Sequence, residues 1–108
     1  MGRELWTREE LLMCLAYYSS SPYPKVFSRE QIKELSGLLQ RRSSDSVSLR
    51  LANFIARDSD MTKLGYLGMS GGGQKVDNIW SEFSDQQGHL DQGAITLAIL
   101  KLANPDGC

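Results

Sequence analysis

Hydrophobic positions follow helical spacing along most of this chain. Thr7-Arg8-Glu9-Glu10 forms a capping box, in which the threonine hydroxyl and the glutamate carboxylate each accept a hydrogen bond from the other residue's backbone amide. The residues from Leu11 to Tyr18 are strong helix formers and apolar on nearly every side. They predict a first, deeply buried helix, which ends before the serines and prolines of segment 19–24.

Two further helices follow, joined by a short polar break. A second capping box beginning at Ser28 predicts a helix over 29–39, and Ser43 or Ser44 begins a third helix that runs to Arg57. The apolar residues of both helices fall at helical intervals: Ile32, Leu35 and Leu39 in the first, and Val47, Leu51 and Phe54 in the second.

The C-terminal half begins with a glycine-rich segment over residues 61–75, whose interleaved apolar side chains indicate a loop packed onto the protein. A short helix over 76–83 and a fifth helix beginning at Asp91 or Gln92 complete the pattern. No strand pattern and no internal repeat occur. We therefore expect an all-α fold, a compact bundle of about five helices in a single domain over residues 1–108.

The predicted core brings together residues from four of these helices. Its members are Leu12, Leu15, Leu35, Leu39, Val47, Leu51, Phe54 and Trp80. The fifth helix contains the run Ala94 to Leu100, which is apolar on more than one side. It is expected either to be buried within the monomer or to contact another protein segment.

Residues 28–58 match the helix-turn-helix pattern, in which one helix braces a second that has a polar face. The first turn of the second helix would present free backbone amides and a positive dipole end to a phosphate. The glycine-rich segment 61–75 could then act as a wing, which would make the fold winged-helix-like. Helical hairpins are also common in all-α proteins that do not bind DNA.

The DNA-binding hypothesis assigns contacts to individual residues of this hairpin. Arg41 and Arg42, beside the start of the second helix, are expected to hold phosphate. Arg50 and Asn53 lie one turn apart on its polar face, and these side chains suit guanine and adenine respectively. The remaining candidates are Ser43, Ser44 and Ser46 at the helix start, Arg57 near its end, and Lys63 and Lys75 as auxiliary contacts.

Several short motifs resemble a known family in their order and spacing. They are Leu5-Trp6-Thr7-Arg8-Glu9-Glu10-Leu11, Pro22-Tyr23-Pro24-Lys25, Ser46-Val47-Ser48-Leu49-Arg50-Leu51-Ala52-Asn53-Phe54, Gly65-Tyr66-Leu67-Gly68 and Ile79-Trp80-Ser81-Glu82-Phe83. Together they resemble the N-terminal domain found ahead of HNH nuclease domains in bacterial restriction-like proteins. The resemblance implies a duplex DNA-binding or target-recognition module of a restriction-type defence system, with modified DNA among its candidate targets.

The same resemblance implies a nuclease domain downstream of this segment or on a partner. No HNH segment is present among the 108 residues, so no cleavage activity is carried over. Where turns of this kind usually hold glycine, the chain has Gln40. A left-handed conformation there would cost a non-glycine residue about 1 kcal/mol.

The distribution of charge gives the DNA-binding hypothesis only weak support. The formal net charge of the whole chain is −1, but residues 25–63 have a net charge of +3 between two acidic ends. A basic middle suits a small DNA-facing surface, although ordinary solvated helix charges would give the same balance.

Enzymatic chemistry finds little support in the sequence. Two cysteines and one histidine provide neither a disulfide framework nor a metal site, and no catalytic constellation or cofactor motif is evident. Segment 70–75 could form an amide nest for a phosphate, with Lys75 assisting, but it lacks the P-loop pattern, and a wing or a plain connector is favoured. We expect a cytoplasmic, non-enzymatic protein without a membrane span.

The alternative to a DNA-binding module is a protein-interaction module. In that case the two C-terminal helices would mediate assembly, and the basic face would be incidental. Either function fits a monomer or a weak dimer. Steep salt dependence of binding would favour DNA, because phosphate contacts release counterions.

Overall fold

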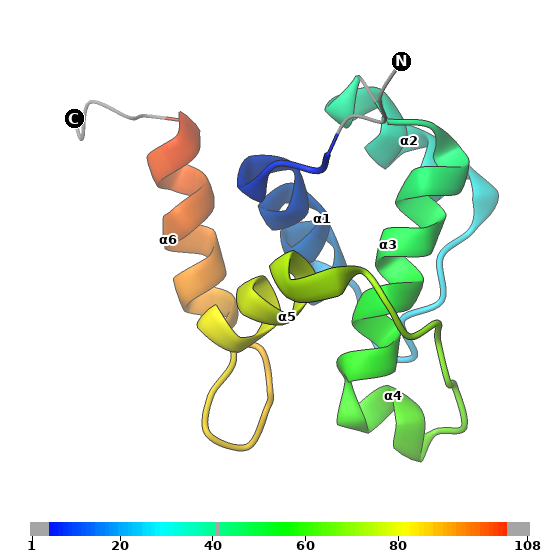
Figure 1. Cartoon of the computed structure of the whole chain (residues 1–108), viewed down its shortest axis with the longest axis vertical. Helices are drawn as coiled ribbons and strands as arrows, with labels where there is room; N and C mark the ends of the chain where they lie inside the picture. The colour runs from blue at the N-terminus through cyan, green and yellow to red at the C-terminus, as the bar shows by residue number, and fades with distance from the viewer. Residues whose placement is uncertain (1–4, 41, 104–108) are drawn as a thin grey trace.

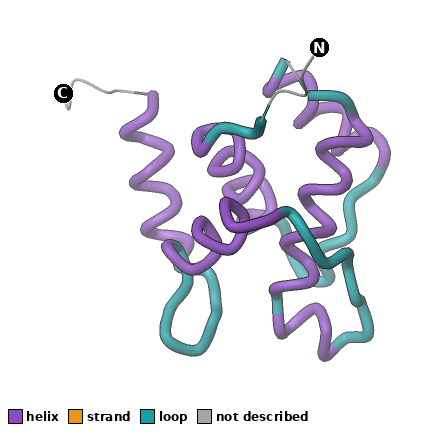
Figure 2. Tube along the Cα trace, viewed as in Figure 1, coloured by secondary structure: helices purple, strands orange, loops and turns teal. Residues whose placement is uncertain are grey.

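The computed structural model describes residues 5–40 and 42–103, which form six α-helices and no β-strand (Figures 1 and 2). The helices are α1 (Arg8–Ser20), α2 (Arg29–Leu39), α3 (Ser44–Arg57), α4 (Ser59–Lys63), α5 (Gly73–Glu82) and α6 (Gln92–Ala103). The all-α prediction is confirmed. The helix that the sequence did not predict is α4, a single turn that directly follows α3.

Helix α1 is the centre of the bundle, and α2, α3, α5 and α6 all pack against it. Its predicted capping box is present: the Thr7 amide donates to Glu10 Oε1 at 3.0 Å, and the Glu10 amide donates to Thr7 Oγ1 at 3.1 Å. Figure 1 shows α5 crossing in front of α1, with α3 on one side and α6 on the other. A helix with apolar residues all round therefore has a neighbour on nearly every side.

All eight residues predicted for the core are buried. The rings of Tyr18, Phe54 and Trp80 meet at the centre, with centroid separations of 5.9–6.0 Å. Full burial of each large apolar side chain contributes about 1.5–3 kcal/mol to folding. This core joins α1, α3 and α5 and determines which face of α3 lies inside.

The α2–α3 hairpin has the predicted helix boundaries. Ser28 caps α2, and the Ser43 hydroxyl caps α3 by accepting from the Ser46 amide at 3.2 Å. Between them Gln40 adopts a positive φ of 65°, and its amide donates to Ser36 O. The turn thus forms with glutamine at the position where glycine was expected.

A buried polar group joins α3 to α4 and to the segment that follows α1. Asp58 is 3% exposed, and it accepts hydrogen bonds from the Tyr18 hydroxyl at 2.7 Å and the Tyr23 hydroxyl at 2.8 Å. Its other carboxylate oxygen caps α4 by accepting from the Asp60 amide. Lys25, also buried, donates to the Tyr18 carbonyl at the end of α1. These bonds explain why the chain turns sharply at Asp58.

Helix α6 differs from the other long helices because it packs against α1 and no other described helix. Ile95 is its one fully buried residue, while Leu97, Leu100 and Leu102 are exposed. It lies at one edge of the molecule in Figure 1. None of the described helices is long and apolar enough to cross a membrane.

Candidate nucleic-acid interface

The beginning of α3 is arranged partly as the sequence suggested. Ser43 and Asp45 are exposed, and Ser44 and Ser46 are half-buried beside them. Arg41, predicted to hold phosphate here, lies outside the described residues. The serines therefore remain accessible at the positive end of the helix dipole, where an anion would be stabilised.

Arg42, predicted to hold phosphate at the surface, is largely buried and is paired within the protein. It is 9% exposed and forms an ion pair with Glu10 of α1, with Nη2–Oε1 at 2.7 Å and Nε–Oε2 at 3.0 Å. Nη2 also donates to the Leu5 carbonyl at 2.7 Å. Hydrogen bonding from Arg42 is the main reason that the pKa of Glu10 falls to about 2. The guanidinium therefore joins the α2–α3 turn to the start of α1.

Asn53 also departs from its predicted position on an outward polar face. It is 1% exposed; its Nδ2 donates to the Met69 carbonyl at 2.7 Å, and its Oδ1 accepts from Arg50 Nη1 at 2.7 Å. Both ends of the amide are thus engaged within the protein. A base edge cannot reach this side chain unless the glycine-rich loop moves away.

Arg57, near the end of α3, is likewise held within the protein. Its guanidinium pairs with Asp77 of α5, with Nη2–Oδ1 at 2.6 Å, and donates to the backbone carbonyls of Asn53 and Gly71. Asp58 is the carboxylate next to Arg57 in the sequence, but it is not the partner. Asp58 instead accepts from two tyrosines, so the partner came from a helix that is distant in sequence.

The glycine-rich loop covers this face of α3 with its backbone. A Cβ atom at Gly68 would lie 2.5 Å from both Ala52 O and Ala56 N, so only glycine allows the approach. The Met69 amide donates to Ala52 O at 3.1 Å. The prediction that the loop is packed down is confirmed for the backbone, while its apolar side chains point outward. Those exposed side chains are Leu64, Tyr66, Leu67 and Met69.

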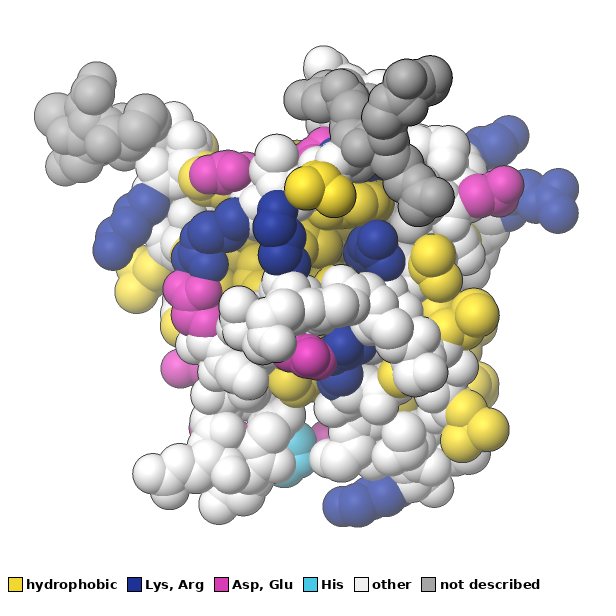
Figure 3. Space-filling view, viewed as in Figure 1, with side chains coloured by type: hydrophobic (Ala, Val, Ile, Leu, Met, Phe, Trp, Pro, Cys, Tyr) yellow, Lys and Arg dark blue, Asp and Glu magenta, His cyan; other side chains and the backbone are white. Residues whose placement is uncertain are grey.

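A basic pocket of about 760 Å³ lies between the first turns of α3 and α5 and the segment before α1. Its lining residues are Leu5, Trp6, Leu11, Arg42, Ser46, Leu49, Arg50, Gly72, Gly73, Gln74, Lys75 and Val76. No carboxylate is among these described lining residues. Figure 3 shows lysine and arginine side chains in a row above α5, next to an exposed hydrophobic area. We call this site the basic pocket.

Three cations surround Trp6 in the basic pocket. The guanidinium carbons of Arg42 and Arg50 lie 4.8 and 5.3 Å from its ring centre, and Lys75 Nζ donates to its carbonyl at 2.9 Å. Burial, with the nearby Arg42 charge, lowers the pKa of Arg50. Arg42 is neutralised by Glu10, so Arg50 and Lys75 supply the positive charge that is available to a ligand.

Two donor groups in the basic pocket are open to a bound anion. Within the described part of the chain, Arg50 Nε is buried and has no hydrogen-bond partner. Gly72 precedes α5 with a φ of 87° and provides no side-chain cap, so the first amides of α5 are uncapped. Unpartnered buried donors are uncommon in folded proteins and often indicate a site for an anion or water.

Sequence reasoning predicted several lining residues but not the pocket itself. Arg42, Ser46, Arg50 and Lys75 are candidates from the sequence, whereas Trp6 and the amides of Gly72 and Gly73 were not assigned to DNA. The signal in the sequence is the run of glycines followed by Lys75, a pattern that could form an amide nest for a phosphate. Lys63, the remaining candidate, is exposed at the end of α4 and does not line the basic pocket.

Two reactive side chains of the described residues, Cys14 and His89, lie outside the basic pocket. Cys14 is buried, and desolvation raises the pKa of its thiol to about 12. His89 Nε2 lies 3.4 Å from Asp60 Oδ2 at the surface. Among the described residues, no group of three or more histidine, cysteine or acidic side chains could hold a metal ion.

Comparison with known proteins adds no relative to this description. No protein family, no curated protein and no solved structure matches the chain.

Proposed function

We propose that this protein is a duplex DNA-binding module and that its basic pocket holds a backbone phosphate. One observation carries the proposal: Arg50, Lys75 and the uncapped amides of α5 converge on a pocket without a carboxylate in its lining. A phosphate there would accept hydrogen bonds from donors that have none or few within the protein. It would also face the positive dipole ends of both α3 and α5.

The proposal changes the part that α3 plays. In a helix-turn-helix protein the second helix enters the major groove with an outward polar face. Here the glycine-rich loop covers the Asn53 side of α3, so the helix contributes its first turn, through Ser46, and its Arg50. Because phosphate contacts position a protein without specifying sequence, base contacts would come from elsewhere.

The resemblance to the domain ahead of HNH nucleases supports the choice of DNA over other polyanions. It also suggests a place in a restriction-type system, in which this module would deliver a nuclease to target DNA that could be modified.

A protein-interaction function is the second candidate. The exposed leucines of α6 favour it, and the two functions can coexist because the surfaces are separate.

Salt-dependent DNA binding tests the proposal. Fluorescence anisotropy with a labelled duplex at several salt concentrations should show affinity falling with salt, and Lys75→Ala should reduce the slope by about one unit. Lys101→Ala is the matched control, since it removes an exposed lysine of α6 that lies outside the basic pocket. It should leave the slope nearly unchanged.

Arg50→Ala should weaken binding by roughly 10- to 100-fold, as expected for a lost hydrogen bond to a charged group. Thermal unfolding of the variant checks that the fold survives the loss of the bond to Asn53. Arg50→Lys keeps the charge but loses the planar fork, so it should restore only part of the affinity. Unchanged DNA affinity in both Arg50→Ala and Lys75→Ala would reject the basic pocket as the binding site.

A further inference from the structure

Helix α6 carries two apolar or uncharged stripes, and only one of them has a partner. Each stripe follows the i, i+3, i+4, i+7 spacing of a helix-packing face. The inner stripe consists of Ile95, Ala98, Ile99 and Leu102, and the outer stripe consists of Gly93, Thr96, Leu97 and Leu100. The inner stripe packs on α1, whereas Leu97 and Leu100 in the outer stripe are 62% and 57% exposed.

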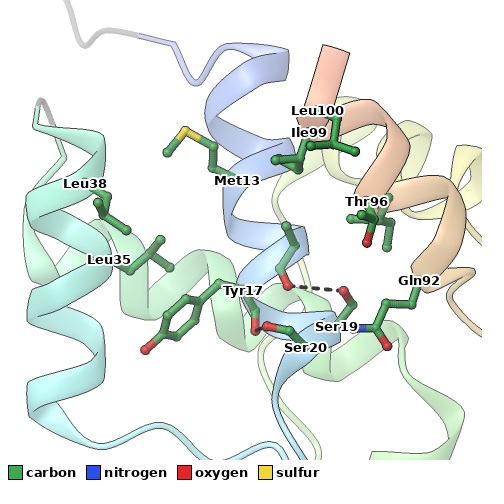
Figure 4. A pocket seen from close by; sticks show the side chains of 12 residues that line it. Met13, Tyr17, Ser19, Ser20, Leu35, Leu38, Gln92, Thr96, Ile99 and Leu100 are labelled. Atoms are coloured by element: carbon green, nitrogen blue, oxygen red, sulfur yellow. Dashed lines mark hydrogen bonds between the residues drawn. The ribbon is translucent and has the colours of Figure 1, made fainter. Parts of the chain in front are cut away.

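A groove runs beside the outer stripe, between α6 and α2, with α1 as its floor. It has a volume of about 370 Å³, and Figure 4 shows Leu35 and Leu38 on one wall, facing Ile99 and Leu100 on the other. Leu38 is 59% exposed, although it faces an apolar groove. The groove contains no charged side chain in its lining. Such a lining favours an occupant with an uncharged surface, because a charge buried there would have no partner.

The chain itself provides one such surface on α6. Residues 92–100 of α6 include no charged residue. The other helices exposed around the bundle carry charges: α2 contains four charged residues in 29–34, and α3, α4 and α5 each carry at least one exposed carboxylate or lysine. A partner helix with the properties of α6 would bury its leucines in the groove without stranding a charge.

Self-pairing also suits the arrangement of the two features. A twofold dimer requires one patch that is complementary to itself, and the outer stripe and the groove share Thr96 and Leu100 and adjoin along α6. The groove is open at the surface, whereas small-molecule sites bury most of their ligand. We propose that the protein forms a twofold dimer in which the outer stripe of α6 enters the groove between α2 and α6 of a second copy.

The size of the contact indicates a weak dimer. A twelve-residue helix is about 18 Å long, so two such helices and their grooves give an interface near the lower end of the range for specific association. The dimer would therefore form in a concentration-dependent way. The basic pocket lies between α3 and α5 and does not share a lining residue with the groove, so this proposal does not depend on DNA binding.

Sedimentation velocity over a micromolar to millimolar concentration series, under reducing conditions, tests the dimer. The unmodified chain should shift from monomer to dimer, and Leu97→Glu should raise the dissociation constant at least about tenfold. Leu38→Glu, on the opposite wall, should do the same. Leu67→Glu is the matched control, because Leu67 is 78% exposed on the glycine-rich loop and lies away from the groove.

Three results would overturn the proposal. The first is a protein that stays monomeric at every concentration. A monomer that binds an apolar dye or an uncharged helical peptide in the groove belongs to this result, because the groove would then have another occupant. The second is a dimer that Leu97→Glu leaves intact. The third is a dimer that is sensitive at Leu97 but not at Leu38, because the partner would then bind outside the groove.

Discussion

The polar face in the middle of α3 is buried, whereas the apolar outer stripe of α6 is exposed to solvent. Asn53, a polar residue of α3, is 1% exposed, whereas Leu97, an apolar residue of α6, is 62% exposed. Amphipathic spacing alone predicts the reverse for both. The comparison shows that helical periodicity separates a polar face from an apolar face but does not determine which face is covered by the rest of the chain.

The polar side of α3 is covered because the glycine-rich loop brings backbone groups that need partners. Backbone amides and carbonyls near a protein surface are paired wherever water is excluded. Asn53 satisfies the Met69 carbonyl, and the Ala52 carbonyl satisfies the Met69 amide. Polar side chains on α3 are therefore suited to a loop backbone. The hydrogen-bonding groups that suit a loop backbone are the same ones that the sequence analysis matches to base edges.

No described segment covers the outer stripe of α6 as the glycine-rich loop covers α3. Its inner stripe is covered by α1, and nothing within residues 5–40 and 42–103 packs on its outer stripe. A cluster of exposed leucines at helix-packing spacing is typical of an interaction surface. The polar face of α3 is thus covered within the monomer, whereas the outer stripe of α6 is left for another chain to cover.

The largest expected difference between the two regions concerns stability. Leu51 is 2% exposed on the inner face of α3. Leu51→Ala should lower the free energy of unfolding by roughly 2–5 kcal/mol, because the cavity that it leaves cannot collapse fully. Leu97→Ala should change the free energy of unfolding of the monomer by less than about 0.5 kcal/mol. Denaturant titration at low protein concentration measures both. Similar losses would mean that the outer stripe is packed within the monomer.

The next prediction concerns the buried pair that fixes the α2–α3 turn on α1. The pKa of Glu10 is about 2 in the folded protein and near 4.5 when the carboxyl is unperturbed. A lowered folded pKa contributes stability above the unfolded pKa, and this contribution disappears as the pH falls from about 5 to about 2. Its size is about 3 kcal/mol.

Denaturant titration at several pH values should show this loss, and Glu10→Gln should flatten it. The variant should also be less stable near neutral pH, since the buried Arg42 would lose the carboxylate of Glu10. Both effects should be much smaller for Glu82, because Arg8 lowers the pKa of this carboxyl in the same direction but the ion pair is exposed and screened by solvent. An acid profile identical to that of the parent would show that Glu10 does not anchor the turn.

Most of the fold was predictable because it depends on local rules. The capping boxes at Thr7 and Ser28 and the apolar spacing of α2 and α3 specify helix boundaries within a few neighbouring residues. The extra helix α4 was missed because it depends on Asp58. That residue follows α3 and caps the next turn through one carboxylate oxygen, while two tyrosines distant in sequence donate to the other.

The candidate site was harder to predict because its residues depend on distant partners. Arg42 meets Glu10 across 32 positions, and Arg57 meets Asp77 across 20. The sequence shows that these side chains are charged, but it does not show which ones are neutralised within the protein. Lys75 stays a predicted contact, and its position follows from local features: a glycine run and the start of a helix.

A smaller effect is expected from the glycine that allows the loop to cover α3. Gly68→Ala combines a left-handed φ of 65° with a Cβ atom 2.5 Å from backbone atoms of α3, and should cost about 2–3 kcal/mol. Gly65→Ala is the control, since its φ is 99° but nothing lies within 4 Å of the added carbon. It should cost only about 1 kcal/mol. Equal costs would mean that the loop does not press on α3.

The smallest effect concerns Gln40, which holds the turn between α2 and α3. Its φ of 65° and ψ of −41° suit glycine better than a residue with a side chain, and its side chain is exposed. Gln40→Gly should therefore raise the free energy of unfolding by about 1 kcal/mol, because released strain exceeds the extra freedom of the unfolded chain. Gln40→Ala keeps the strained backbone and should stay near the parent value. A glycine variant less stable than the alanine variant would show that the turn is not strained. Any gain should leave the dissociation constant of the α6 dimer unchanged, since the turn lies outside the groove.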